Sequence, residues 1–117
     1  MSFYHFTCDH GHKWLGQCGL LRPWGQVVLP GEPKLIWFTD QPAPARYAMG
    51  LTSHQLHCDR MRYRYRALAE RDIVPWTEYA AQFPVKVRKE LEVGRAPDHW
   101  FISEIPVLAI LDEAVRR

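Results

Sequence analysis

Several features that direct a chain to a membrane or to the cell exterior are missing here. No apolar run in these 117 residues approaches the ~20 residues that span a bilayer. The first residues carry no basic segment followed by an apolar run, which a secretory signal requires. Cysteine is scarce, and three is an odd number, which argues against a disulfide framework. We therefore expect a cytoplasmic protein with reduced thiols and no membrane contact.

Strong charge and the common nucleotide-binding loops are missing as well. The net charge of +2 is too small to indicate nucleic acid by itself. The sequence holds no Gly-x-Gly-x-x-Gly and no P-loop, so a nucleotide would be held by other devices. The length fits one domain, residues 1–117. A hydrophobic content of 47%, with five Trp, five Tyr and five Phe, supplies a modest core.

The first forty residues predict two strands and a helix. Aromatic and polar residues alternate over residues 2–7, which predicts a strand with His5 and Thr7 on one face. We expect a helix that has Asp9 as its N-cap, runs to about Cys18 and stops at Gly19. Residues 34–39 form a short apolar run between turn residues, which predicts a buried strand.

The rest of the chain predicts more strands than helices. Alternation is clearest over residues 56–67, where Tyr63 and Tyr65 face one way and four arginines face the other. A helical region starts at residue 74, Pro84 interrupts it, and a second helix follows to about residue 93. Strands are expected over residues 99–105 and 107–111, and a frayed tail over residues 112–117. Because these strands do not alternate regularly with helices, we predict an α+β fold.

Residues 2–47 follow the motif order of a known enzyme group. The motifs are His5-Phe6-Thr7, then Gly19-Leu20, then Ile36-Trp37-Phe38-Thr39-Asp40, and finally Tyr47. This order resembles the ADP-ribosyltransferase superfamily, in the branch with a His-Tyr-Glu triad that includes poly-ADP-ribose polymerases, diphtheria-type toxins and DNA-targeting thymine ADP-ribosyltransferases. The resemblance implies a small split sheet, mixed or antiparallel, with a few short helices. It also implies NAD as the substrate, with ADP-ribose transferred to an unknown protein or nucleic-acid acceptor.

The resemblance assigns NAD-binding roles to five residues. His5 and Thr7 would bind a ribose, and Tyr47 would stack on nicotinamide; Trp37 and Thr39 would complete the NAD-binding set. A histidine and a hydroxyl at i, i+2 on a rigid strand offer the donor and acceptor that a sugar needs. The alternative for His5 is a buried strand histidine that hydrogen-bonds to the backbone.

Glu104 is the acid that the resemblance implies. In that branch a glutamate on a late strand binds the other ribose and stabilises the oxocarbenium-like transition state as nicotinamide leaves. Ser103-Glu104-Ile105-Pro106-Val107 is similar to that motif, although Pro106 departs from it. The rivals in the tail or on a helix are Glu90, Glu92 and Glu113. If Glu104 is not catalytic, nucleotide binding without any transfer is the alternative.

Four alternate arginines form a basic stripe that suits phosphate groups. These are Arg60, Arg62, Arg64 and Arg66. They would bind the phosphates of NAD or of a nucleic acid, whereas the commoner reading of such a stripe is a solvated strand face. The second hypothesis is therefore a non-catalytic nucleotide- or nucleic-acid-binding module of the same fold.

A metal site is the third hypothesis, and the sequence argues against it. Two groups of cysteine and histidine are present: Cys8, His10, His12 and Cys18, and then His54, His57 and Cys58. Zinc takes four nitrogen or sulfur ligands in a tetrahedron, and alternate residues at a helix start give poor geometry for one ion. We expect no bound structural metal.

Overall fold

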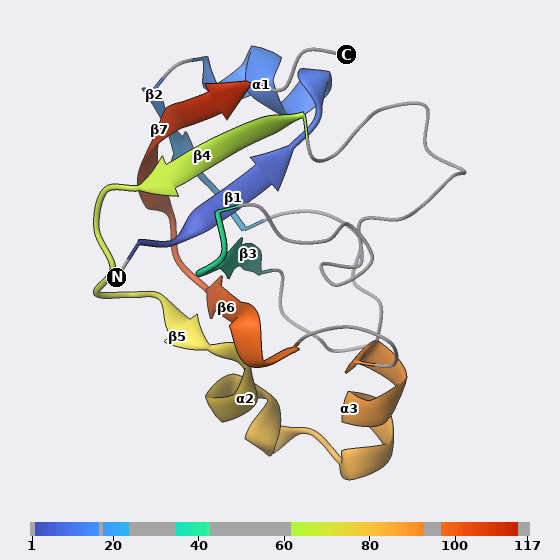
Figure 1. Ribbon diagram of the computed structural model, residues 1–117. Helices are drawn as coiled ribbons and strands as arrows, with labels where there is room; N and C mark the ends of the chain where they lie inside the picture. Colours follow the sequence, from blue (N-terminus) through green and yellow to red (C-terminus); the bar gives the residue numbers. More distant parts are fainter. Residues whose placement is uncertain (1, 17, 24–34, 43–61, 93–96, 115–117) are drawn as a thin grey trace.

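The computed structural model describes residues 2–16, 18–23, 35–42, 62–92 and 97–114 (Figure 1). In chain order the elements are β1 (Tyr4–Thr7), α1 (Asp9–Leu15), β2 (Cys18–Leu21), β3 (Ile36–Thr39), β4 (Tyr63–Ala67), β5 (Val74–Pro75), α2 (Trp76–Tyr79), the 3₁₀ turn η2 (Ala80–Gln82), α3 (Val85–Glu92), the 3₁₀ turn η3 (Pro97–His99), β6 (Trp100–Ser103) and β7 (Val107–Ala114). Within these ranges, no helix has the length and apolar character that a membrane crossing needs.

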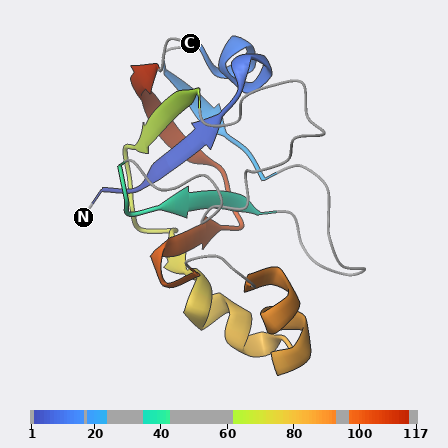
Figure 2. The ribbon, with the colours of Figure 1, turned by 45° about the vertical axis from the view of Figure 1, so that its right-hand side comes forward.

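The described strands form one sheet in the order β2-β7-β4-β1-β3-β6-β5, and every registered pair is antiparallel. With a few short helices beside this sheet, the predicted α+β class is confirmed. Strands β1 and β3 share the shortest pairing in the sheet, with one registered pair, Tyr4 opposite Thr39. Figures 1 and 2 show α1 at one end of the sheet and α2 and α3 at the other.

The sheet carries two cores, one on each face. Along β3, Phe38 packs in the first core, whereas its neighbour Trp37 packs against the second. Side chains alternate between faces along a strand, so the two cores lie on opposite sides. The buried residues of the first core are Phe3, Leu21, Ile36, Phe38, Tyr65, Ala67, Ile73, Val107 and Ala109. Those of the second are Leu35, Trp76, Ala80, Trp100 and Ile102.

Helix α1 is shorter than predicted. Cys18, which was expected at its end, is the first residue of strand β2. Cys8 holds the N-cap position, Asp9 is the first helical residue, and the helix ends at Leu15. Gly16 stops it with a φ of 66°, a backbone conformation that favours glycine. Gly19, the predicted stop, lies instead in β2 opposite Ala109 of β7.

Strand ends also differ from the sequence prediction. β6 stops at Ser103, whose Oγ donates to the Ile105 carbonyl at 2.7 Å and accepts from the Ile105 amide at 3.2 Å. This local turn replaces ladder bonds, so the predicted strand over residues 99–105 is too long. The predicted frayed tail is wrong at its start, because β7 continues to Ala114 along β4. Residues 56–61 of the predicted basic strand lie outside the described part, and β4 covers the rest.

Candidate functional site

His5 is held in one orientation on β1. Its Nδ1 lies 2.8 Å from the Trp37 carbonyl oxygen, and because a carbonyl only accepts, Nδ1 carries the proton. Its ring meets Phe38 edge-on, with ring centres 5.9 Å apart. Burial lowers the pKa of His5, and the hydrogen bond to Trp37 offsets only part of that effect. The imidazole is therefore neutral near pH 7, and its bond to Trp37 matches the alternative of a strand histidine that hydrogen-bonds to the backbone. The lone pair of Nε2 remains an acceptor.

Thr7 shares the face of His5 and lies beneath helix α1. The two residues pair with Tyr63 and Tyr65 of β4, so all four side chains lie on one side of the sheet. The Thr7 hydroxyl is in close contact with Gly11 of α1. The predicted i, i+2 pair of histidine and hydroxyl is thus on one face, next to the start of α1.

Trp37 and Thr39 lie on the other face from His5. Thr39 pairs with Tyr4, which alternates with His5 along β1. The Trp37 ring packs against Trp76 at 5.0 Å and Trp100 at 5.6 Å, within the second core. The Thr39 side chain is fully buried, and its Oγ1 accepts from the Gln41 amide at 3.1 Å. The backbone carbonyl of Trp37 contacts His5, whereas the side chains of Trp37 and Thr39 are packed on the other face of the sheet.

Two of the predicted site residues, Tyr47 and Arg60, fall outside the described residues. The stacking of Tyr47 on a nicotinamide ring therefore stays a prediction, and so does a shared cleft for Tyr47 and His5.

Glu104 lies in the turn between β6 and β7, not on a strand as predicted. Its side chain is exposed and makes no hydrogen bond or ion pair with the described residues. It lines a pocket together with Val74 and Ile102, and Ile102 belongs to the second core. This pocket therefore opens on the face opposite to His5. The rival acids lie on α3 (Glu90 and Glu92) and on β7 (Glu113).

The predicted alternation of tyrosines and arginines along β4 is confirmed. The arginines differ, however, in how strongly other residues hold them. Tyr65 is fully buried while Arg66 is exposed, as the period-2 pattern predicts. The Arg62 guanidinium lies 5.9 Å from the Tyr63 ring centre. Arg64 is different, because it is held by several structural partners.

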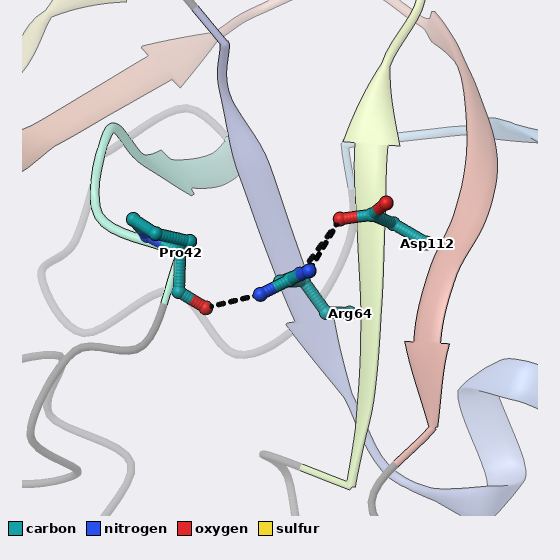
Figure 3. A network of polar contacts seen from close by, with 3 residues as sticks. All are labelled: Pro42, Arg64 and Asp112. Atoms are coloured by element: carbon teal, nitrogen blue, oxygen red, sulfur yellow. Dashed lines mark hydrogen bonds and ion pairs between the residues drawn. The ribbon is translucent and has the colours of Figure 1, made fainter.

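Arg64 ties three parts of the chain together (Figure 3). Its Nε donates to Asp112 Oδ2 at 2.8 Å, and its Nη2 lies 2.7 Å from the same oxygen. Its Nη1 donates to the Pro42 carbonyl at 2.7 Å, and the guanidinium lies 5.0 Å from the centre of the Tyr4 ring. These contacts join β4, β7 and the segment after β3, so Arg64 is committed to the fold.

A polar network that sequence reasoning missed fixes α1 on β4. The Tyr65 hydroxyl donates to the Gly16 carbonyl, so its oxygen accepts a hydrogen bond from His12 Nδ1, 2.7 Å away. The His12 ring stacks on Tyr63 with centres 4.0 Å apart and planes 9° apart. Burial raises the pKa of Tyr65, and the neighbouring Tyr63 adds to the rise. No local signal predicts this network, because 53 residues separate His12 from Tyr65.

Of the first group considered for zinc, the structure describes the side chains of Cys8 and His12. Among the described residues, no group of three or more His, Cys, Asp and Glu side chains is placed to hold a metal ion. His12 is committed to Tyr65, and the second group, His54, His57 and Cys58, lies outside the described residues.

A second histidine pairing lies at the far end of β3. His99 Nδ1 lies 2.8 Å from Asp40 Oδ1, which ties η3 to the residue that follows β3. This pair is half-exposed.

Comparison of the chain with models of protein families, with curated protein sequences and with solved structures gave no match. The resemblance to the ADP-ribosyltransferase superfamily therefore rests on the sequence motifs in residues 2–47 and on the looser one in residues 103–107.

Proposed function

We propose that this protein binds NAD and acts as an ADP-ribosyltransferase-like enzyme, transferring ADP-ribose to a macromolecular acceptor. The observation that supports it best is the state of His5. Nδ1 is fixed by the Trp37 carbonyl, and burial lowers the pKa and keeps the ring neutral, so Nε2 is an oriented acceptor. A sugar hydroxyl is a suitable donor for such a nitrogen, and Thr7 adds a hydroxyl on the same face.

In this proposal Glu104 supplies the negative charge at the reacting ribose. A carboxylate beside the developing oxocarbenium acts mainly in the transition state, because the positive charge is absent from bound NAD. Its removal should therefore lower turnover far more than NAD affinity.

A non-catalytic binding module is the second candidate, and the position of Glu104 favours it. His5 points to the first core's face, whereas Glu104 lies in an exposed turn at a pocket on the other face. A nucleotide bound at His5 would then not meet Glu104 at its reacting sugar. Binding would persist in such a module, and nicotinamide would not be released.

Three measurements on four proteins separate the two candidates. NAD affinity, nicotinamide release and acceptor labelling are followed for the wild type, His5→Ala, Glu104→Gln and His99→Ala. In the transferase, Glu104→Gln cuts turnover by about 10²–10³ with little change in NAD affinity. His5→Ala weakens NAD binding as well, because the ribose contact exists in the ground state. His99→Ala is the matched control, since His99 is a half-exposed histidine that pairs with Asp40.

Two outcomes go against the transferase. If the wild type binds NAD but releases no nicotinamide, and Glu104→Gln changes nothing, the binding module stands. If no NAD binding is detected, or if His5→Ala and His99→Ala weaken it equally, His5 is not a ribose contact and the proposal fails.

A further inference from the structure

A pocket of about 240 Å³ lies between β5, α2 and the turn after β6. Its lining residues are Asp72, Val74, Tyr79, Ile102, Glu104 and Ile105. Three of these are aliphatic, one is aromatic and two are carboxylates. A small concave site with an apolar floor and a few polar groups at its rim is the usual form of a ligand site.

The walls of this pocket are fixed by the sheet and by an aromatic stack. Val74 of β5 pairs with Ile102 of β6, so the floor belongs to the sheet. The Tyr79 ring lies 6.0 Å from Trp76 and 5.8 Å from Phe83, measured between ring centres. Trp76 is fully buried, which anchors this stack to the second core. The pocket therefore needs no rearrangement of α2 to accept a ligand.

Two carboxylates line the pocket, and no described cation neutralises them. Asp72 precedes β5 and Glu104 lies in the turn after β6, and both side chains are exposed. Neither carboxylate makes a hydrogen bond or an ion pair with any described residue. The pocket therefore combines aliphatic side chains with negative charge, which favours a cationic group on an apolar stem.

We propose that this pocket binds the cationic side chain of a lysine or arginine presented by a partner protein. The alkyl stem of such a side chain would lie along the aliphatic side chains of Val74, Ile102 and Ile105, as long basic side chains commonly cover apolar surface. Its charged end would meet the carboxylates of Asp72 and Glu104. This binding does not require NAD, so the inference goes beyond the proposed function.

The probes are the N-acetyl amides of arginine and lysine, with those of citrulline and norleucine as uncharged counterparts. Amide chemical shifts of the whole protein are followed during titration. The basic amides bind in the millimolar range and shift residues of β5, α2 and the turn after β6, while the uncharged amides bind more weakly. Asp72→Asn and Glu104→Gln each weaken binding of the basic amides roughly two- to fivefold, the range for an exposed ion pair. Glu78→Gln leaves binding unchanged, because this exposed carboxylate of α2 does not line the pocket.

Several results would overturn the inference. These are equal shifts with charged and uncharged amides, shifts outside the pocket, no shifts at all, or equal weakening by Glu78→Gln and Asp72→Asn. Shifts at the pocket with Mg²⁺ or Ca²⁺ but not with the amides would assign it to a metal ion instead. The titrations contain no NAD, so a negative result with the basic amides does not bear on the NAD proposal. Loss of NAD binding in other variants likewise does not bear on binding of the basic amides.

Discussion

Thr7 and Gly11 approach so closely that no side chain fits between them: a Cβ added to Gly11 would lie 1.9 Å from Thr7 Oγ1. The same atom would lie 3.1 Å from Thr7 Cβ, so rotating the hydroxyl away relieves only part of the clash. This contact sets how deep α1 lies on β1, on the face of His5.

We expect Gly11→Ala to destabilise the protein, although alanine is normally the better helix residue by about 1 kcal/mol. Overpacking costs about 1–3 kcal/mol and outweighs that preference. Chemical denaturation of Gly11→Ala, Thr7→Ala and the double variant measures the coupling. Because Thr7→Ala removes Oγ1 and Cγ2 and leaves only the 3.1 Å approach of Cβ, the double variant should be more stable than additivity predicts. Strict additivity would mean that the helix moves instead.

Tyr65→Phe should lower the free energy of unfolding by about 1–3 kcal/mol. It removes the hydroxyl that links His12 and Gly16, and leaves a donor and a carbonyl without that partner. Tyr4→Phe is the control, because the half-exposed Tyr4 keeps its ring under Arg64. Urea denaturation measures the free energy of unfolding of both variants. An equal decrease in the two would contradict a stabilising role of the network.

The stability of the protein should depend on the protonation of His5. Burial lowers its pKa in the folded state, so at pH above the unfolded value of about 6.5 both states are neutral and nothing is lost. As the pH falls below 6.5, the unfolded chain takes up a proton that folded His5 resists. Stability then falls by up to about 1.4 kcal/mol per pH unit until the folded pKa is reached.

The comparison with His5→Asn isolates this effect. Asparagine does not titrate and can still donate to the Trp37 carbonyl. Thermal or chemical denaturation between pH 7.5 and pH 5 should give a flatter profile for His5→Asn than for the wild type. Parallel profiles would mean that another group causes the acid sensitivity.

Arg64→Lys should destabilise the protein by about 1–2 kcal/mol, whereas Arg66→Lys should be close to neutral. A lysine cannot reach Asp112 and Pro42 together with the fork of a guanidinium, and it loses the planar contact with Tyr4. Arg66 is exposed on the same strand and is the matched control. Equal effects at the two positions, measured by urea denaturation, would show that the Arg64 contacts contribute nothing specific.

Sequence patterns correctly predicted the strands and helices that are determined by residues close together in the sequence. The alternation of residues 2–7 and the tyrosine-arginine stripe gave β1 and the correct faces of β4, and Pro84 correctly marked the start of α3. β2 was missed because its cause is distant: Cys18–Leu21 is a strand since Val107–Ile110 pairs with it. Gly16 and Gly19 were both possible helix stops, and the sequence prediction chose Gly19 where the structure uses Gly16.

In the candidate site, too, the features set by nearby residues were predicted and those set by distant contacts were not. The alternation of β1 correctly predicts that His5 and Thr7 share a face, and this needs only the strand period. The separation of Trp37 and Thr39 from His5 depends on the register of β3 against β1, which no short motif contains. The place of Glu104 depends on the turn closed by Ser103, and the partners of Arg64 are 22 and 48 residues away.

The position of β7 has a consequence for how the chain folds as it is made. β7 lies between β2 and β4, which never pair with each other. Both of these strands leave the ribosome well before residues 107–114, and each then exposes an unpaired edge towards the place that β7 will fill. The sheet closes only through contacts distant in sequence, which makes folding slow compared with local hairpins. A nascent chain stalled before β7 should therefore be the species most prone to aggregate and the one that most needs a chaperone.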